Sequence, residues 1–230
     1  MRFALPLLLL AGCSSVDRDL VLRTRAQLER AGTAFRQHEG PPQPEALLPA
    51  AWAKGQYAVW AINKGDSDVT TLTEVQVEEA DENGFIVMMT IITTRLRTTA
   101  RLTFSKQPRT HDEARDFLTQ VIRRRGEERA LTYRFHRDMP VDMRDALEPL
   151  WATLVPQPVE GKVETASTLS STMEGCRPSQ GRFIFSPLPL EVQGLLHPAV
   201  PINGLVFAKA KSGETLQLID HGWSGGGPAL

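Results

Sequence analysis

The chain has 230 residues, of which 41% are hydrophobic and 23% charged, a composition and length that suit a folded body with a sizeable core. Its 26 lysines and arginines nearly balance its 27 aspartates and glutamates, and the formal net charge is −1. This balance gives no electrostatic basis for binding nucleic acid, so we expect no nucleic-acid partner.

Residues 1–13 have the three parts of a secretory signal. A positive charge at Arg2 precedes an apolar run over residues 3–10 and then small residues. The run is too short for a transmembrane helix, which needs about 20 apolar residues. The stretch Leu10-Ala11-Gly12-Cys13 closely resembles the lipobox of bacterial lipoproteins. This resemblance implies cleavage after Gly12 and lipidation of Cys13, and Ser14 in the next position favours the outer membrane.

Lipidation would tether the rest of the chain to the bacterial cell envelope, on the periplasmic side of the outer membrane. Two or more acyl chains anchor a protein stably, so membrane lipid is the expected partner of Cys13. The alternative, a buried N-terminal strand with an ordinary cysteine, is disfavoured because the next residues are polar. With Cys13 lipidated, Cys176 has no intramolecular disulfide partner. Cys176 could be reactive or pair between chains, but packing at a strand end is favoured.

A helix is expected over residues 15–37, because apolar residues recur there along a single stripe. The helix could be a stalk, but one apolar stripe favours packing on the body. A proline-rich stretch at 40–44 ends it and forms a stiff connector. The expected organisation is a signal peptide at 1–12 and a lipidated N-terminus with helix and linker at 13–50. A single domain at 51–222 and a flexible tail at 223–230 complete it.

An antiparallel meander of about four strands is predicted between residues 56 and 105. Alternating apolar and polar residues indicate half-buried strands, and Asn83-Gly84 favours a hairpin turn. Arg95, Arg97 and Arg101 would share one face of the fourth strand. On that face they could form ion pairs with the acidic residues of the second strand or, less favoured, bind an anion.

A second helix is predicted over residues 110–126. Thr110 and Glu113 form a capping box, and apolar residues from Ala114 to Ile122 give a buried face. The basic run Arg123–Arg125 would complement the negative end of the helix dipole. A strand at 130–136 and a helix at 141–154 follow; Pro149 should kink or split this helix. The inward side chains of this third helix would be Met143, Ala146, Leu147, Leu150 and Trp151.

Four more strands are predicted in the last third, at 162–169, 181–185, 204–210 and 215–220. Grouped strands with helices between the groups predict an α+β fold. The expected architecture is a curved, half-barrel-like antiparallel sheet with two or three packed helices, besides the N-terminal helix.

Short stretches spread along the body carry a second resemblance: Gly55-Gln56-Tyr57, Glu174-Gly175-Cys176, Val200-Pro201-Ile202-Asn203-Gly204, Gly213-Glu214-Thr215 and Leu218-Ile219-Asp220-His221-Gly222. Together they resemble a family of uncharacterised bacterial envelope lipoproteins and periplasmic proteins with a β-rich body. In outline the arrangement is similar to half-barrel carriers of the lipoprotein-localisation type. The resemblance implies a concave sheet face that could hold a lipid or another apolar ligand, and it brings no catalytic residue set.

Several short stretches resemble catalytic or metal-binding motifs, but each lacks the neighbouring residues or the spacing that the motif requires. Residues 222–226 match G-x-S-x-G, but only four residues follow, too few for the helix and triad partners. His136-Arg137-Asp138 begins like a kinase catalytic loop, but Met143 stands where the metal-binding asparagine belongs. Asp66, Asp68 and Glu74 lack EF-hand spacing. The five histidines lie at positions 38, 111, 136, 197 and 221, without metal-ligand spacing. We therefore expect no cofactor, no metal and no enzymatic activity.

The leading hypothesis is a non-catalytic, lipid-anchored envelope protein that binds an apolar ligand or a protein partner. An accessory subunit of an envelope secretion or assembly complex is the alternative, and it predicts a body without a cavity. A hydrolase built from dispersed residues is the third. It requires a pocket in which a histidine lies within hydrogen-bond reach of a carboxylate or hydroxyl.

Overall fold

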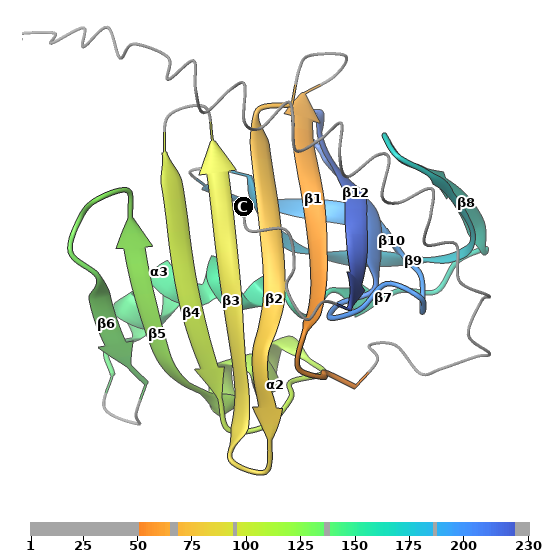
Figure 1. The fold of residues 1–230 in the computed structure, drawn as a ribbon. Helices are drawn as coiled ribbons and strands as arrows, with labels where there is room; N and C mark the ends of the chain where they lie inside the picture. Colours follow the sequence, from red (N-terminus) through yellow and green to blue (C-terminus); the bar gives the residue numbers. More distant parts are fainter. Residues whose placement is uncertain (1–50, 65–68, 94–95, 136–138, 186–187, 224–230) are drawn as a thin grey trace, which may run out of the picture.

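The computed structural model describes residues 51–64, 69–93, 96–135, 139–185 and 188–223. In these ranges the chain forms one twelve-stranded sheet, ordered β6-β5-β4-β3-β2-β1-β12-β11-β10-β9-β7, with β8 paired to β9 (Figure 1). The strands are β1 Gln56–Lys64, β2 Thr71–Asp81, β3 Gly84–Thr93, β4 Arg97–Phe104, β5 Leu118–Arg125, β6 Leu131–Arg134, β7 Gln157–Pro158, β8 Glu164–Ser167, β9 Thr172–Phe185, β10 Leu188–Leu196, β11 Leu205–Ala210 and β12 Glu214–Trp223. The signal sequence, Cys13, the helix expected at 15–37 and the linker lie outside the described residues.

The expected α+β class is wrong, because the described chain is mostly β. Its helices are two short ones, α2 at His111–Phe117 and α3 at Val141–Ala152. The antiparallel character of the sheet is as expected, since all the strand pairs are antiparallel. Residues 118–125, which were expected to be helical, and residues 172–180 and 188–196, for which no element was predicted, have joined the sheet. This explains the difference in class.

The helix predicted at 110–126 is correct only in its first part. Thr110 caps α2 as expected, because the backbone N–H of Glu113 donates to its Oγ1 at 3.2 Å. After α2 the chain becomes β5, which pairs with β4 on one side and β6 on the other. Thr119, Val121 and Ile122 are β-branched and suit a strand, and pairing covers the otherwise open edge of β4. Arg123–Arg125 therefore end a strand and complement no helix dipole.

Strand β9 is longer than the sequence predicted. The strand expected at 181–185 begins instead at Thr172, so that Gly175 and Pro178 lie inside the fourteen-residue β9. Pro178 is tolerated because β9 lies near the edge of the sheet, where its other neighbours are the short strands β7 and β8. β10, which the sequence did not predict, pairs with β9 over its full length of nine residues.

Helix α3 is continuous from Val141 to Ala152 in spite of Pro149. Leu147, Leu150 and Trp151 are buried as expected, but Ala146 is exposed, so that part of the prediction is wrong. The side chain of Met143 lies outside the described part of the structure. The hydroxyl of Thr153 donates to the carbonyl of Pro149 at 3.1 Å and so satisfies one acceptor of the last turn.

The meander β1–β4 matches the sequence pattern. Ala100, Leu102 and Phe104 face the core, and Arg97 and Arg101 share the other face. β2 and β3 join at Asp81–Gly84, where the carboxylate of Asp81 accepts the backbone N–H of Asn83 at 2.8 Å.

Replacing Gly84 with alanine should destabilise the β2–β3 hairpin strongly. Gly84 has a φ of +131°, and a Cβ there would overlap the backbone oxygen of Phe104. Backbone strain alone costs about 1–3 kcal/mol, and the overlap adds to it. Gly213→Ala is the matched control. Gly213 also has a positive φ, +96°, but a Cβ there would meet no atom within 4 Å, so this variant carries the backbone strain without the overlap. We expect denaturant unfolding to show a larger stability loss for Gly84→Ala; equal losses would contradict this.

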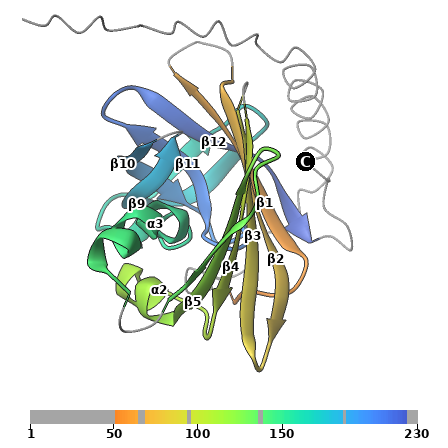
Figure 2. The same cartoon turned by 90° about the vertical axis from the view of Figure 1, so that its left-hand side faces the viewer.

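The sheet bends, so that the strands near its β7 end fold back over one face of the strands β2–β5. Seen from the side in Figure 2, strands β9–β11 and both helices lie on the same side of β2–β5. This concave side is filled with fully buried side chains from both parts of the sheet and from the α3 region. The largest are Trp60, Trp151, Phe104 and Phe183, and Leu154 beside α3 is also fully buried there.

The loop between β10 and β11 fixes the end of α3. Asn203 is buried, and its amide donates to the carbonyl of Thr153 at 3.0 Å. The carbonyl of Ile202 accepts the indole N–H of Trp52 at 2.9 Å. Ile202 has a φ of 71°, rare for a β-branched residue, and these bonds hold it there. The loop therefore sets the distance between α3 and strands β9–β11.

Candidate functional site

A cavity of about 820 Å³ lies where the end of α3 approaches β9, β10 and β11, and we call it the α3 cavity. Gly181, Val192 and Ala210 are register neighbours on these three strands and form a row of small or apolar residues along it. Ala152 and Val155 line it from the α3 side and are almost fully buried. The volume falls in the range of small-molecule sites, about 300–1,000 Å³.

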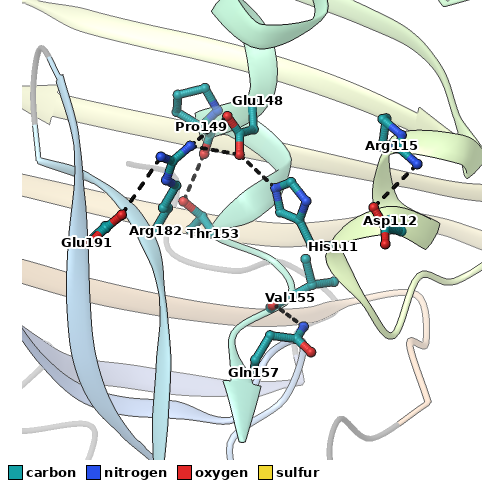
Figure 3. Close-up of polar contacts among 10 residues, drawn as sticks. All are labelled: His111, Asp112, Arg115, Glu148, Pro149, Thr153, Val155, Gln157, Arg182 and Glu191. Carbon is teal, nitrogen blue, oxygen red and sulfur yellow. Dashed lines mark hydrogen bonds and ion pairs between the residues drawn. The ribbon is translucent and has the colours of Figure 1, made fainter.

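Charged side chains lie at the exposed part of the cavity, and Glu148 is at their centre (Figure 3). Arg182 Nη1 donates to both carboxylate oxygens of Glu148, at 3.0 and 2.9 Å. His111 Nε2 lies 2.9 Å from Glu148 Oε1, on the other side of the carboxylate. Arg182 Nη2 is also 3.9 Å from Glu191. These contacts join α2, α3, β9 and β10 at one point.

The pair of His111 and Glu148 has the composition of a general base, but not its geometry. Nε2 is close to the carboxylate but forms no hydrogen bond with it. The carboxylate is already bound by Arg182 through both of its oxygens. Among the described residues that line the cavity, none carries a hydroxyl or thiol that could act as a nucleophile. The arrangement ties α2 to α3 and gives no acyl-transfer machinery.

Lys209 and Lys211 also line the cavity and flank the buried Ala210. Both are exposed, and neither has a carboxylate partner in the described part of the chain. Gln180, Gln193 and Lys209 are register neighbours. Because successive side chains of a strand point to opposite faces, these three lie on the face away from Val192 and Ala210, which are buried in the core. The cavity is therefore lined mainly by polar and charged side chains.

Neither a metal centre nor a membrane-spanning helix occurs in the ranges that the structure describes. No group of three or more potential metal ligands comes together there. No helix in those ranges has the length and apolar character needed to cross a bilayer.

No protein-family model and no curated protein matches the chain. Three solved structures are similar to it at low identity. A putative lipoprotein from Parabacteroides distasonis is 10% identical, with a TM-score of 0.30, 74% of this chain covered and 96% of that chain. A putative exported protein with a YmcC-like fold from Bacteroides fragilis is 11% identical, with a TM-score of 0.30; the match covers 74% of this chain and 96% of that one. A hypothetical protein from Chlamydia trachomatis is 10% identical, with a TM-score of 0.33; the match covers 77% of this chain and 92% of that one. Scores of this size do not establish a common fold, so the function is inferred from this chain itself.

The sequence motifs are dispersed in the structure. His111 contacts Glu148. Nδ1 of His197 accepts the backbone N–H of Ala199 at 3.2 Å, which is a local role. Burial lowers the pKa of His197, and a hydrogen bond from its ring to the backbone carbonyl of Glu174 opposes this by raising it. His221 lies in β12 opposite Ala58. The other two histidines, residues 66–68 and Ser224 lie outside the described residues.

The sequence missed Glu148 and Arg182, which organise the charged part of the cavity. They lie 34 residues apart and follow no motif, and only the approach of α3 to β9 brings them together. The single sequence signal was the amphipathic pattern of residues 141–154, which predicted that one face of α3 would pack on the sheet.

The face of the sheet opposite the core carries ion pairs, as the sequence suggested. Arg101 Nε donates to Glu78 Oε2 at 2.9 Å and Arg101 Nη2 lies 3.6 Å from Glu79, so Arg101 is paired. Glu74 on the same face is buried, against the expectation of a solvated face. The hydroxyl of Tyr57 lies 3.4 Å from both oxygens of the buried Asp220, and burial followed by this carboxylate raises the pKa of Tyr57 to about 12.

Cys176 is fully buried within β9, away from the strand ends where it was expected. Its thiol donates to the carbonyl of Met173 at 3.3 Å, and burial raises its pKa, only partly opposed by a hydrogen bond from the backbone of Ala166. A thiol with a raised pKa is a poor nucleophile.

Cys176 should therefore resist thiol reagents in the folded protein. In a Cys13→Ser chain, where it is the sole cysteine, we expect Ellman's reagent to react at least about 100-fold more slowly in buffer than in denaturant. Similar rates in the two conditions would mean that the β8–β9 region opens readily.

Proposed function

We propose that this protein is a non-catalytic, lipid-anchored protein of the bacterial cell envelope that binds an apolar or amphipathic ligand in the α3 cavity. The observation that carries the ligand role is a cavity of about 820 Å³ beside the end of α3, on which side chains of α2, α3 and strands β9–β11 converge. Its volume is within the range of small-molecule sites, about 300–1,000 Å³.

The anchor is supported by the lipobox-like stretch that ends in Cys13 and by the polar residues that follow it. Its site is the outer membrane, with the body in the periplasm. Radiolabelled palmitate should be incorporated into the wild-type protein in cells and not into Cys13→Ala. Equal labelling would contradict lipidation at Cys13, and recovery with the inner membrane on a density gradient would contradict the outer-membrane site.

The cavity also favours ligand binding over the role of an accessory subunit, since that role predicts a body without a cavity. Glu148, Arg182 and His111 then serve to hold the helices against the strands and to keep the cavity open.

Native mass spectrometry of the protein purified from its envelope fraction tests the ligand role. Bound lipid or another apolar molecule should be seen with the wild type and lost in Ala152→Phe, whose ring would occupy the cavity. Ala146→Phe is the matched control, because Ala146 is on the same helix but exposed and outside the cavity lining. If Ala152→Phe unfolds by circular dichroism, Gln193→Trp, at an exposed position of the cavity lining, fills the space from β10 instead. Protein without any bound ligand would contradict the role.

A further inference from the structure

We infer that residues 15–37 pack their apolar stripe against a second apolar cluster, which lies on the face of the sheet opposite the core. We call this cluster the convex patch, and it consists of Tyr57, Val59, Ala61, Leu72, Ile92 and Ile219. The docking does not involve the α3 cavity. Only its effect on the length of the membrane tether rests on the proposed lipid anchor.

The convex patch faces away from the main core. Along β1, members of the patch alternate with members of the core cluster, which are Ala58, Trp60 and Ile62. Successive side chains of a strand point to opposite faces, so the two sets lie on opposite sides of the sheet. Leu72 of β2 is the register neighbour of Ala61 and of Ile92 on β3. The patch therefore runs across three adjacent strands.

The convex patch is covered, although α2 and α3 both lie on the other side of the sheet (Figure 2). Ala61 and Leu72 are fully buried, and Ile219 is 2% exposed. Neighbouring strands shield a side chain only from beside, so a leucine reaches such burial when another element packs on top of it. Within the described ranges, Val69 is the one further hydrophobic residue that packs against the patch. The cover therefore comes from outside these ranges.

Acidic side chains beside the patch favour a basic cover. Glu74 and Asp220 are each 7% exposed and are the register neighbours of Val59 on its two sides. Buried carboxylates need positive charge or hydrogen-bond donors close by. Residues 15–37 contain five arginines and three acidic residues, so their charge is complementary to this face.

Residues 15–37 also have the apolar surface and the length that the patch requires. Their stripe, at helical spacing, is formed by Leu20, Val21, Thr24, Leu28, Ala31 and Phe35. A helix of this length extends about 35 Å, close to the roughly 30 Å of a strand such as β1. Residues 38–50 can span about 40 Å, which is enough to return the chain from the patch to the start of the sheet.

Docking of residues 15–37 would hold the body close to the membrane. If Cys13 carries the lipid, an undocked connection from residue 14 to residue 50 could reach about 120 Å. With the segment on the sheet, only residues 14–19 remain as a free tether, and their reach is about 20 Å. The docked segment would thus confine the body to the neighbourhood of the bilayer surface.

Reactivity of a cysteine placed in the patch tests the docking. Val59→Cys nearly keeps the size of the side chain, and in a Cys13→Ser chain peptide mass spectrometry distinguishes its alkylation by iodoacetamide from that of Cys176. We expect alkylation at least about 100-fold slower in buffer than in denaturant. Ala31→Asp places a carboxylate in the stripe and should accelerate the reaction in buffer at least about tenfold.

Ala26→Asp is the matched control for this measurement. It is the same substitution about 140° away around a helix, outside the stripe, and should leave the alkylation rate unchanged. Rapid alkylation of Val59→Cys in the otherwise unchanged chain would overturn the docking. Protection that Ala31→Asp does not reduce would also overturn it, because another element would then cover the patch.

Photo-cross-linking of the lipidated chain in cells identifies the occupant of the patch. Benzoylphenylalanine in place of Leu28, in the middle of the stripe, should cross-link within the same chain to β1, β2 or β12. In place of Ala26 it should not. Cross-links from position 28 to lipid, to a second copy or to no part of the body would overturn the docking. Absence of palmitate at Cys13 would instead overturn the anchor and leave the docking intact.

Discussion

Trp60→Ala should lower the free energy of unfolding by about 3–5 kcal/mol, the range for removing a large aromatic side chain from a core. Trp60 is fully buried on β1. Its indole N–H donates to the carbonyl of Leu205 at 2.8 Å, and its ring meets Phe183 edge to face with centroids 6.0 Å apart.

These contacts explain why the loss should fall at the upper end for one residue. Leu205 lies two strands from β1 in the sheet order, beyond β12, and Phe183 lies four strands away on β9. One side chain can reach both only because the sheet bends, so Trp60 holds the bend as well as filling space. Its removal would leave a cavity and an unpaired buried carbonyl at the same point.

Two variants make the measurement specific. Trp60→Phe keeps most of the packing but loses the indole N–H, so it should cost about 1–3 kcal/mol, the cost of one unsatisfied buried group. Trp223→Ala removes a tryptophan that is 66% exposed at the end of β12 and should cost less than about 0.5 kcal/mol. Guanidinium unfolding curves should rank the three in this order, and a Trp60→Ala loss as small as that of Trp223→Ala would contradict the role.

The first four strands could be predicted from the sequence because their signals are local. Val75 and Val77 alternate with polar residues, and Asn83-Gly84 marks a turn that only a short hairpin fits. Each of these strands also pairs with the next in the chain, so no long-range information was needed.

The later strands could not be predicted because non-local pairing decides them. Residues 118–122 have helical spacing, and only the open edge of β4 makes them a strand. Pro178 and Gly181 are compatible with β9 because β10 supplies a full partner strand. The fold class was wrong for the same reason: part of a predicted helix became β5, and residues 172–180 and 188–196, which had no predicted structure, became parts of β9 and β10.

The candidate site was beyond sequence reasoning for a related reason. His111 was recognised only as part of a helix cap, which is its local role, and the carboxylate it contacts lies on α3. Arg182 had no signal at all, since arginine within a strand usually faces solvent. Charge pairs between elements far apart in the chain depend on the bend of the sheet, which the sequence does not encode in any short pattern.

Glu74→Gln should make the protein more stable at pH 8 and leave it nearly unchanged at pH 5. Glu74 is 7% exposed on β2, between Val59 of β1 and Thr90 of β3. Burial raises the pKa of its carboxyl to about 7; Arg97 opposes the rise, and Asp220 adds to it.

The direction follows from proton binding. Between pH 4.5, the ordinary value for glutamate, and about 7, the folded protein keeps a proton on Glu74 that the unfolded chain releases. The stability that this proton provides is complete below pH 4.5 and is lost as the pH rises through 7. The shift corresponds to about 3 kcal/mol at most. Glutamine has the same shape but does not ionise, so the variant escapes this loss.

Denaturant unfolding of both proteins at pH 5, 6, 7 and 8 measures the effect directly. The difference in unfolding free energy should grow in favour of Glu74→Gln by about 2–3 kcal/mol across this range. Glu78→Gln on the same strand is the control, because Glu78 is a third exposed and pairs with Arg101, and such pairs contribute less than about 1 kcal/mol. Parallel curves for wild type and Glu74→Gln would mean that the carboxylate ionises normally, and that water reaches this face of β2 in solution.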